Sequence, residues 1–238
     1  MNQELLNARR AAAQIVLAQG YWQDIVEPVE FDGDEDFSIC IRSLISPMTI
    51  EAIAECYTDP EDGLHVLKAI SDLNSQCEIE MAGAVSDVIE TGCSPMYRQM
   101  AAVLHTALVD AGHGSPDLDD ALQSQREFGL SPISAVHLLR FTALKIGDFD
   151  PTDPDLATAV TEQFERIAST VETRLHSHTI RRGVQEVAMH LMVEGQIDAT
   201  TVRTLLSDVQ WPKRPFGLPT DYGWPLLQSR ARLPLETP

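Results

Sequence analysis

The chain of 238 residues has few basic residues and no long apolar run. It holds 17 lysines and arginines against 36 aspartates and glutamates, a formal net charge of −19. Such a charge repels phosphate groups, which argues against nucleic acid and anionic membrane surfaces as partners. No apolar run approaches the roughly 20 residues that span a bilayer, and the N-terminus lacks the apolar segment of a signal peptide. We therefore expect a cytoplasmic protein that does not enter a membrane.

Motifs that identify common enzyme classes are also absent from the sequence. No two of the four cysteines (Cys40, Cys56, Cys77 and Cys93) form a C-x-x-C pair, which argues against a zinc ribbon or a redox motif. We expect these cysteines to be reduced and mostly buried thiols. There is no glycine-rich phosphate loop, no G-x-S-x-G and no H-E-x-x-H. No catalytic activity follows from motifs alone.

What the sequence does contain is a repeated signal for the start of a helix. Serine or aspartate precedes proline at Ser46-Pro47, Ser94-Pro95, Ser115-Pro116, Ser131-Pro132 and Asp153-Pro154. The first residue caps a helix and proline suits the first helical position. Apolar residues then recur at helical spacing in Leu156, Val160, Phe164, Ile167, Val171 and Leu175. A second such series runs up to Gly195, and Asp198 is placed to cap a last short helix.

Strand signals are confined to one place near the N-terminus. Residues 24–31 and 36–44 carry β-branched and aromatic residues around an acidic turn at 32–36. They predict a hairpin or a small sheet edge, with Pro28 on an edge strand. Together with the helix signals, they predict an α+β fold that is mainly α-helical, with a small sheet near the N-terminus.

The helical pattern ends after residue 209. Residues 210–238 contain six prolines, with four basic residues against two acidic ones, and predict an extended C-terminal tail. Its aromatic residues are Trp211, Phe216, Tyr222 and Trp224. They are either a contact for a partner or packed back on their own domain. We therefore divide the chain into a domain over 1–209 and a tail over 210–238.

Three segments resemble the FtsH-type zinc peptidase domain, in the correct order. They are "MAGAVSDVIETG" (81–92), "GSPDLDDALQSQREFGLS" (114–131) and a helical stretch over 164–206 that ends in "GQIDATTVRTLL". Ala82, Gly83 and Gly92 are in register with the first segment's counterpart. The resemblance covers roughly residues 3–209, and a helix at 93–113 is extra to the family pattern.

The resemblance implies that the opening helix corresponds to the family's H-E-x-x-H helix. Arg9 and Ala13 then occupy the histidine positions, Arg10 occupies the glutamate position, and Asp117 matches the third zinc ligand. Arginine stays protonated and alanine has no ligand atom, so we expect neither a cofactor nor catalysis. Asp117 either favours a helix N-terminus or pairs with Arg9 or Arg10.

Two further interpretations stay open beside this one. The main expectation is an inactive pseudopeptidase that binds a protein or an extended peptide, as a regulatory or assembly module. One alternative is a working zinc metallopeptidase whose metal site is rebuilt from His105, His113 and Asp117. The other is a purely structural protein. Whether the chain forms a homo-oligomer is left open.

Overall fold

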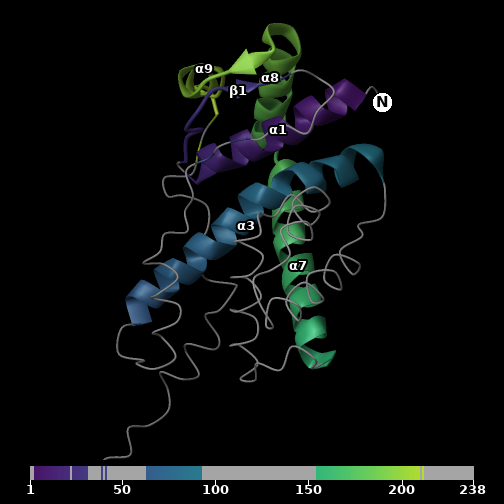
Figure 1. The fold of residues 1–238 in the computed structure, drawn as a ribbon, viewed down its shortest axis with the longest axis vertical. Coiled ribbons are helices and arrows are strands. Elements are labelled where there is room, and N and C mark those ends of the chain that lie inside the picture. Colours follow the sequence, from purple (N-terminus) through teal and green to yellow (C-terminus); the bar gives the residue numbers. More distant parts are fainter. Residues whose placement is uncertain are drawn as a thin grey trace, which may run out of the picture.

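The computed structural model describes residues 3–21, 23–31, 39, 41, 63–92, 154–209 and 211. Its elements are α1 (Gln3–Gly20), β1 (Val29–Glu30), α3 (Gly63–Thr91), α7 (Pro154–Leu175), α8 (His178–Glu194), β2 (Gln196–Ile197) and α9 (Ala199–Leu205) (Figure 1). The predicted architecture, mainly helical with a small antiparallel sheet, is confirmed. The helix expected at 93–113 and the tail beyond Trp211 lie outside the described residues.

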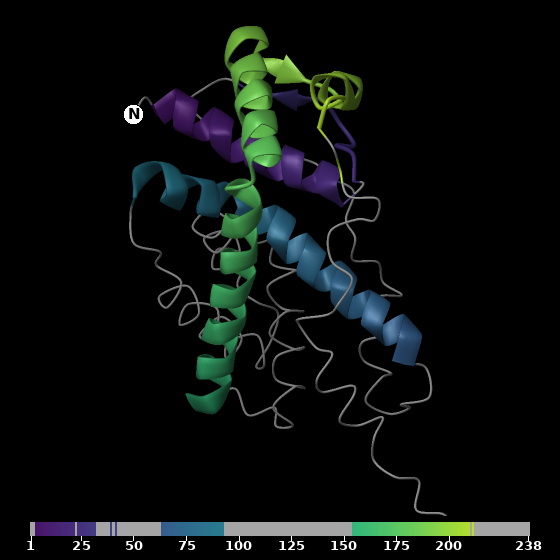
Figure 2. The same cartoon turned by 180° about the vertical axis from the view of Figure 1, so that it is seen from behind.

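Helix α1 is the central element and packs against α3 and α8 (Figures 1 and 2). Its five most buried small residues, Ala8, Ala11, Ala12, Ala13 and Ala18, have no exposed surface. Small side chains allow both neighbouring helices to approach closely. The polar side chains of its middle turns are only partly exposed, so α1 is covered on nearly all sides.

Local signals set the ends of several helices. Helix α7 begins at Pro154, as the Asp-Pro pair predicts. Helix α8 ends at Gly195, whose φ of 67° is the left-handed conformation that favours glycine, and whose N–H donates to the Leu191 carbonyl. Asp198 caps α9, since its carboxylate accepts from the Thr201 N–H at 2.7 Å.

The small sheet pairs segments that are distant in the sequence. Val29 of β1 lies opposite Ile197 of β2, and Glu30 lies opposite Gln196. We predicted that residues 24–31 pair with 36–44, and the bridge between Ile25 and Ile41 shows this contact at one position. Among the described residues β1 pairs with β2, and the rest of the predicted partner segment lies outside them. This pairing ties the N-terminal part of the chain to the α8–α9 connection.

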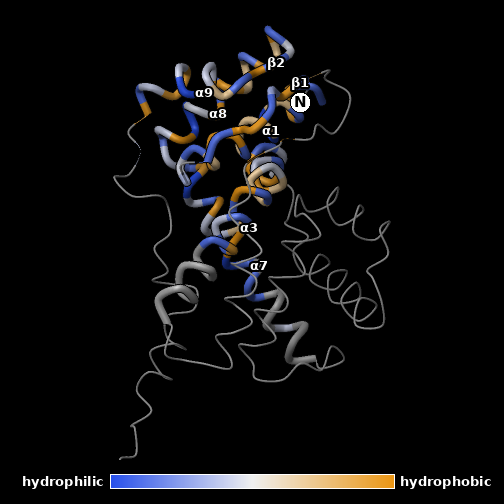
Figure 3. Tube along the Cα trace, turned by 60° about the vertical axis from the view of Figure 1, so that its left-hand side comes forward, coloured by the Kyte–Doolittle hydropathy of each residue, from blue (hydrophilic) through white to orange (hydrophobic). Residues whose placement is uncertain are grey.

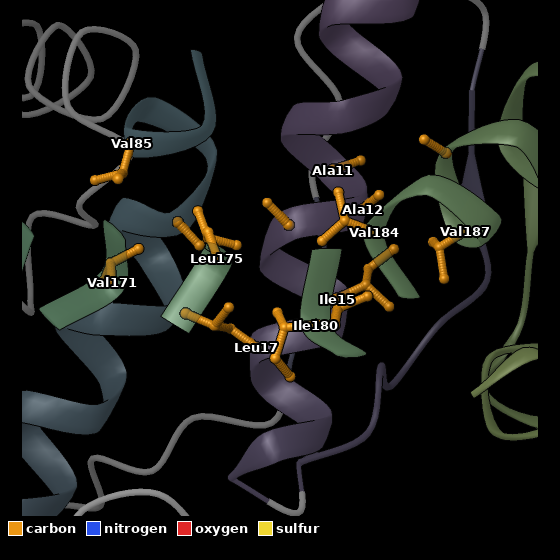
Figure 4. Close-up of a cluster of buried hydrophobic side chains, with 14 of the residues drawn as sticks. Ala11, Ala12, Ile15, Leu17, Val85, Val171, Leu175, Ile180, Val184 and Val187 are labelled. Atoms are coloured by element: carbon orange, nitrogen blue, oxygen red, sulfur yellow. The ribbon is translucent and has the colours of Figure 1, made fainter. Parts of the chain in front are cut away.

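One hydrophobic core joins α1 to the elements around it. Apolar residues gather where α1, α3, α7 and α8 meet (Figure 3). In Figure 4, Ala12 and Ile15 of α1 lie beside Val184 of α8. The largest fully buried side chains are Ile15, Leu17, Leu73, Ile79, Met81, Ile167 and Leu191. Each of them contributes about 1.5 to 3 kcal/mol relative to an exposed position.

The helical spacing predicted for α7 is confirmed where its side chains are described. Ile167, Val171 and Leu175 are all buried, whereas the side chains of Leu156, Val160 and Phe164 lie outside the described residues. None of the helices in the described part of the chain is both long enough and apolar enough to cross a bilayer.

Candidate functional site

The candidate site is the side of α1 that faces α3, where the resemblance places the zinc-binding motif. Arg9 forms an ion pair with Glu90 of α3. Arg10 forms a two-pronged pair with Asp87, in which Nε donates to Oδ2 at 2.8 Å and Nη2 reaches the same oxygen. One turn further along α1, Gln14 Nε2 donates to the backbone carbonyl of Glu80 at 2.9 Å. The contacts run in opposite order along the two helices, so α1 and α3 are antiparallel here.

Gly83 is the position of closest approach between these helices. A β-carbon at Gly83 would lie 2.6 Å from Arg10 Cγ and 3.4 Å from the Arg10 carbonyl oxygen. A side chain there would force the Arg10 side chain, or α1 itself, to shift. The glycine thus lets the aliphatic part of Arg10 cross α3 while its guanidinium reaches Asp87, one turn away.

The residues at the motif positions do not fit a zinc ion. Zinc is held by neutral histidine nitrogens, thiolates or carboxylates. A guanidinium remains protonated and has no lone pair to donate. Ala13, at the second histidine position, is fully buried and has no donor atom. Arg9 and Arg10 therefore form ion pairs that join α1 to α3, and the motif positions do not form a metal-binding site.

Several predicted site residues lie outside the described part of the chain. These are Asp117, His105, His113, Phe216, Tyr222 and Trp224. The pairing of Arg9 or Arg10 with Asp117 therefore stays a prediction, and so does the rebuilt metal site. Among the described residues, no three histidines, cysteines, aspartates or glutamates are grouped so that they can hold a metal.

Trp211 is the one tail aromatic that the structure describes. It is partly buried and packs against the main core, and its N–H donates to the Val209 carbonyl at 3.0 Å. At this position the side chain covers its own domain. The role of the other three aromatic residues as partner contacts remains a prediction.

A second polar cluster, which sequence reasoning missed, joins the end of α1 to α3 and α7. Glu78 is buried, with 2% of its side chain exposed, and forms an ion pair with Arg174 of α7. The Tyr21 hydroxyl donates to the same carboxylate oxygen, and the Arg174 guanidinium lies 5.0 Å from the centre of the Tyr21 ring. This cation–π contact adds to the ion pair. The only sequence signal is the presence of two acidic residues, Glu78 and Glu80, in the otherwise apolar run "CEIEMAGAV".

Cys77 lies directly beside this cluster on α3. It is fully buried and is not in a disulfide, as predicted. Burial, with the negative charges of Glu80 and Glu78 as further causes, raises the pKa of its thiol well above the usual value. Since the thiolate is the nucleophile, we expect this thiol to react slowly in the folded chain.

No known protein family, no curated protein and no solved structure matches this chain. The likeness to the FtsH-type peptidase domain therefore rests on the residues quoted above.

Proposed function

We propose that this chain is a catalytically inactive relative of the FtsH-type zinc peptidase domain. In this proposal it binds a protein or peptide partner, as a regulatory or assembly module. One observation carries the proposal. At the positions that the resemblance assigns to the catalytic motif, Arg9 and Arg10 form ion pairs with acidic residues of α3.

Peptide hydrolysis by this family's chemistry needs zinc ligands and a general base on the opening helix. The base takes a proton from a zinc-bound water, which is the task of the motif's glutamate. Arg10 stands at that position, and its guanidinium has no lone pair with which to accept a proton. The side chains at the motif positions of α1 therefore bind to α3 and do not activate a water molecule.

The arrangement of the helices supports the resemblance on which the proposal depends. Helix α1, which the resemblance matches to the zinc-motif helix, packs directly on α3, which carries the segment 81–92 that also resembles the family. Gly83 stands where these helices cross, and Gly92 follows the end of α3 with a φ of 66°. Both glycines belong to the residues that are in register with the family pattern. Each has a structural reason to be glycine here.

The proposal places the partner at one of two surfaces. The β1–β2 sheet suits an extended peptide that adds as a further strand, because main-chain hydrogen bonds then supply the affinity. Glu30 of β1 is exposed and marks this surface. The tail that follows Trp211 is the second surface, with Tyr222 and Trp224 as candidate contacts.

Restoring the motif tests the relationship and the loss of catalysis together. The triple variant R9H/R10E/A13H reinstates H-E-x-x-H on α1. If the fold is that of the peptidase, the variant binds zinc, and adding Asp117→Ala weakens that binding by about tenfold or more. The matched control is R9H/R10E, which lacks the second histidine. Zinc is measured by mass spectrometry on protein purified without a chelator, and circular dichroism verifies the helical content.

The unmodified chain is tested in parallel against an unstructured protein substrate with added zinc. We expect no hydrolysis. Hydrolysis that depends on one zinc per chain, and that is lost in His105→Ala or His113→Ala, would establish the rebuilt metallopeptidase site and refute the proposal.

Partner binding is tested by selecting a library of random peptides on the intact chain. We expect selected peptides that lose affinity in Glu30→Lys or in Y222A/W224A, according to which surface binds. The matched control is Glu165→Lys, an equal charge change at an exposed position of α7. If no peptide is retained, the binding role is refuted and the structural interpretation is favoured.

A further inference from the structure

The break between α7 and α8 is concentrated in one backbone torsion. Helix α7 ends at Leu175 and α8 begins at His178, so that only residues 176 and 177 lie between them. The N–H of His176 still donates to the Glu172 carbonyl at 3.0 Å, as in a continuing helix. Ser177 has a φ of −59°, which a helix also requires. Its ψ, however, is 130° in place of the helical value of about −42°.

The beginning of α8 is poorly stabilised as a helix end. The Ser177 hydroxyl caps no backbone N–H, and lies 3.2 Å from the Thr179 hydroxyl oxygen instead. The first turn carries no acidic residue, and Arg181 places a positive charge at the positive end of the helix dipole. Helix ends also leave backbone N–H and carbonyl groups without helical partners. One continuous helix over 154–194 would pair these groups and would place Arg181 far from any helix end.

Packing on other elements holds the two helices in the broken arrangement. Helix α7 packs on α3, whereas α8 packs on α1 and β2 pairs with β1 (Figure 2). The fit of α8 is close, since a β-carbon at Gly183 would lie 2.9 Å from Leu206 Cδ2 and 3.5 Å from Val16 Cγ1 of α1. In a continuous helix, the changed torsion at Ser177 would turn this buried face away from the chain's own α1. An α1 from a second copy offers the same fit.

We propose that two copies of this chain exchange residues 178–209, in a dimer in which α7 and α8 form one helix. The exchanged segment, with α8, β2 and α9, packs on α1 and β1 of the other copy. The contacts of the monomer are kept between copies, including the β1–β2 pairing and the ion pair of Arg203 with Asp24. Such an exchange is a low-cost route to a dimer, whose population the hinge at 176–177 and the chain concentration determine. The inference does not depend on the proposed function.

Two substitutions at the hinge shift the balance in opposite directions. His178→Pro suits the monomer, because proline is favoured at the first helical position and the residue before it favours the extended ψ that Ser177 has. Inside a continuous helix the same proline breaks the helix, so we expect dimerisation to weaken at least about a hundredfold. Ser177→Ala favours a helix interior at both hinges of the dimer, and we expect dimerisation to strengthen about fivefold. The matched control is Ser169→Ala, the same change at an exposed position inside α7, which should leave the dimer unchanged.

The measurement is sedimentation velocity over a range of chain concentrations. Exchange requires α8 to leave α1, so each protein is first unfolded in urea and refolded at high concentration. Circular dichroism verifies that every variant regains its helical content. We expect the fraction of dimer to rise from His178→Pro through the unmodified chain to Ser177→Ala.

A disulfide across the small sheet distinguishes exchange from any other dimer. Glu30 and Gln196 are exposed and lie opposite each other in β1 and β2, at a spacing that suits a disulfide. The variant E30C/Q196C is made in a chain with Cys40, Cys56 and Cys93 replaced by serine, and the separated monomer and dimer are then oxidised. In the monomer the bond forms within one chain. In the exchanged dimer it joins two chains, which then run as a dimer on a denaturing gel without reductant.

Three results would overturn the proposal. The first is that both the unmodified chain and Ser177→Ala remain monomers after refolding. The second is a dimer in which the 30–196 disulfide stays within one chain. The third is that His178→Pro dimerises as readily as the unmodified chain.

Discussion

Arg10 of α1 crosses Gly83 of α3 so closely that a β-carbon at residue 83 would stand 2.6 Å from Arg10 Cγ. The crossing positions the guanidinium on Asp87, and the neighbouring Arg9 on Glu90. The seam between the two helices thus combines close backbone approach with two ion pairs. The two features depend on each other, since a larger residue at 83 would move Arg10 away from α3.

The first prediction concerns Gly83→Ala. Alanine normally stabilises a helix interior relative to glycine. Here we expect the variant to be less stable by about 1 to 3 kcal/mol, because the added methyl group overlaps Arg10 Cγ and displaces the Arg10 side chain from Asp87 or the two helices from each other. Urea unfolding followed by circular dichroism measures the change.

The matched experiment for this prediction is the double variant G83A/R10A. Removing Arg10 Cγ relieves the overlap, so the two substitutions together should cost less than the sum of their separate costs. If Gly83→Ala is as stable as the unmodified chain, the close crossing of α1 and α3 is wrong.

The second prediction concerns the buried pair of Glu78 and Arg174. Arg174→Met removes this guanidinium from beside the buried Glu78 carboxylate, and we expect a loss of about 3 to 5 kcal/mol. The double variant E78Q/R174M should recover part of this loss. Glutamine is uncharged, and its side-chain oxygen still accepts from the Tyr21 hydroxyl.

Chemical unfolding of the three proteins measures these differences. The control is Arg203→Met, which removes the exposed pair between Arg203 and Asp24 and should change stability little. A double variant less stable than Arg174→Met alone would show that the buried charge is not the source of the loss.

The helix ends were predictable because the groups that set them lie within a few residues of each other. Each of these helix ends is set by a residue that acts on backbone groups of its own turn. The residues are Pro154, Gly195 and Asp198. Such bonds depend little on the rest of the fold, so short sequence patterns are sufficient to find them.

Contacts between distant segments were not predictable in the same way. Each strand of the β1–β2 sheet has two residues, too few to show an alternating pattern, so nothing in the sequence pointed β1 to residue 197. The partners of Arg9 and Arg10 depend on how α1 packs on α3. This packing cannot be predicted from the positions of charged residues in the sequence. The alanines of α1 are weakly apolar, so their complete burial left only a faint signal.

The third prediction concerns the reactivity of Cys77. Burial raises the pKa of its thiol, so we expect no alkylation of the folded chain at mildly alkaline pH, and rapid alkylation in urea. The experiment uses a chain with Cys40, Cys56 and Cys93 replaced by serine, so that Cys77 is the one thiol observed. Mass spectrometry after timed exposure to iodoacetamide gives the rate. Alkylation of the native chain as fast as that of a free thiol would contradict the burial of this part of α3.

The last prediction is the pH dependence that Asp198 gives to the fold. The Thr201 N–H, which donates to Oδ1 at 2.7 Å, lowers the pKa of this carboxyl below its usual value of 3.8. A lowered folded-state pKa gives stability that is present above the unfolded value and is lost as the pH falls through the folded value. Asp198→Ala should therefore lower the melting temperature by a few degrees at pH 7, and the difference should shrink below pH 3.8.

Asp198→Asn is the matched control, because an amide oxygen still caps the helix but carries no charge. Its melting temperature should lie between those of the other two proteins at pH 7, and should converge on that of the unmodified chain in acid. Thermal unfolding followed by circular dichroism over this pH range measures all three. A difference between Asp198→Ala and the unmodified chain that stays constant in acid would mean that the carboxylate charge does not contribute to the cap.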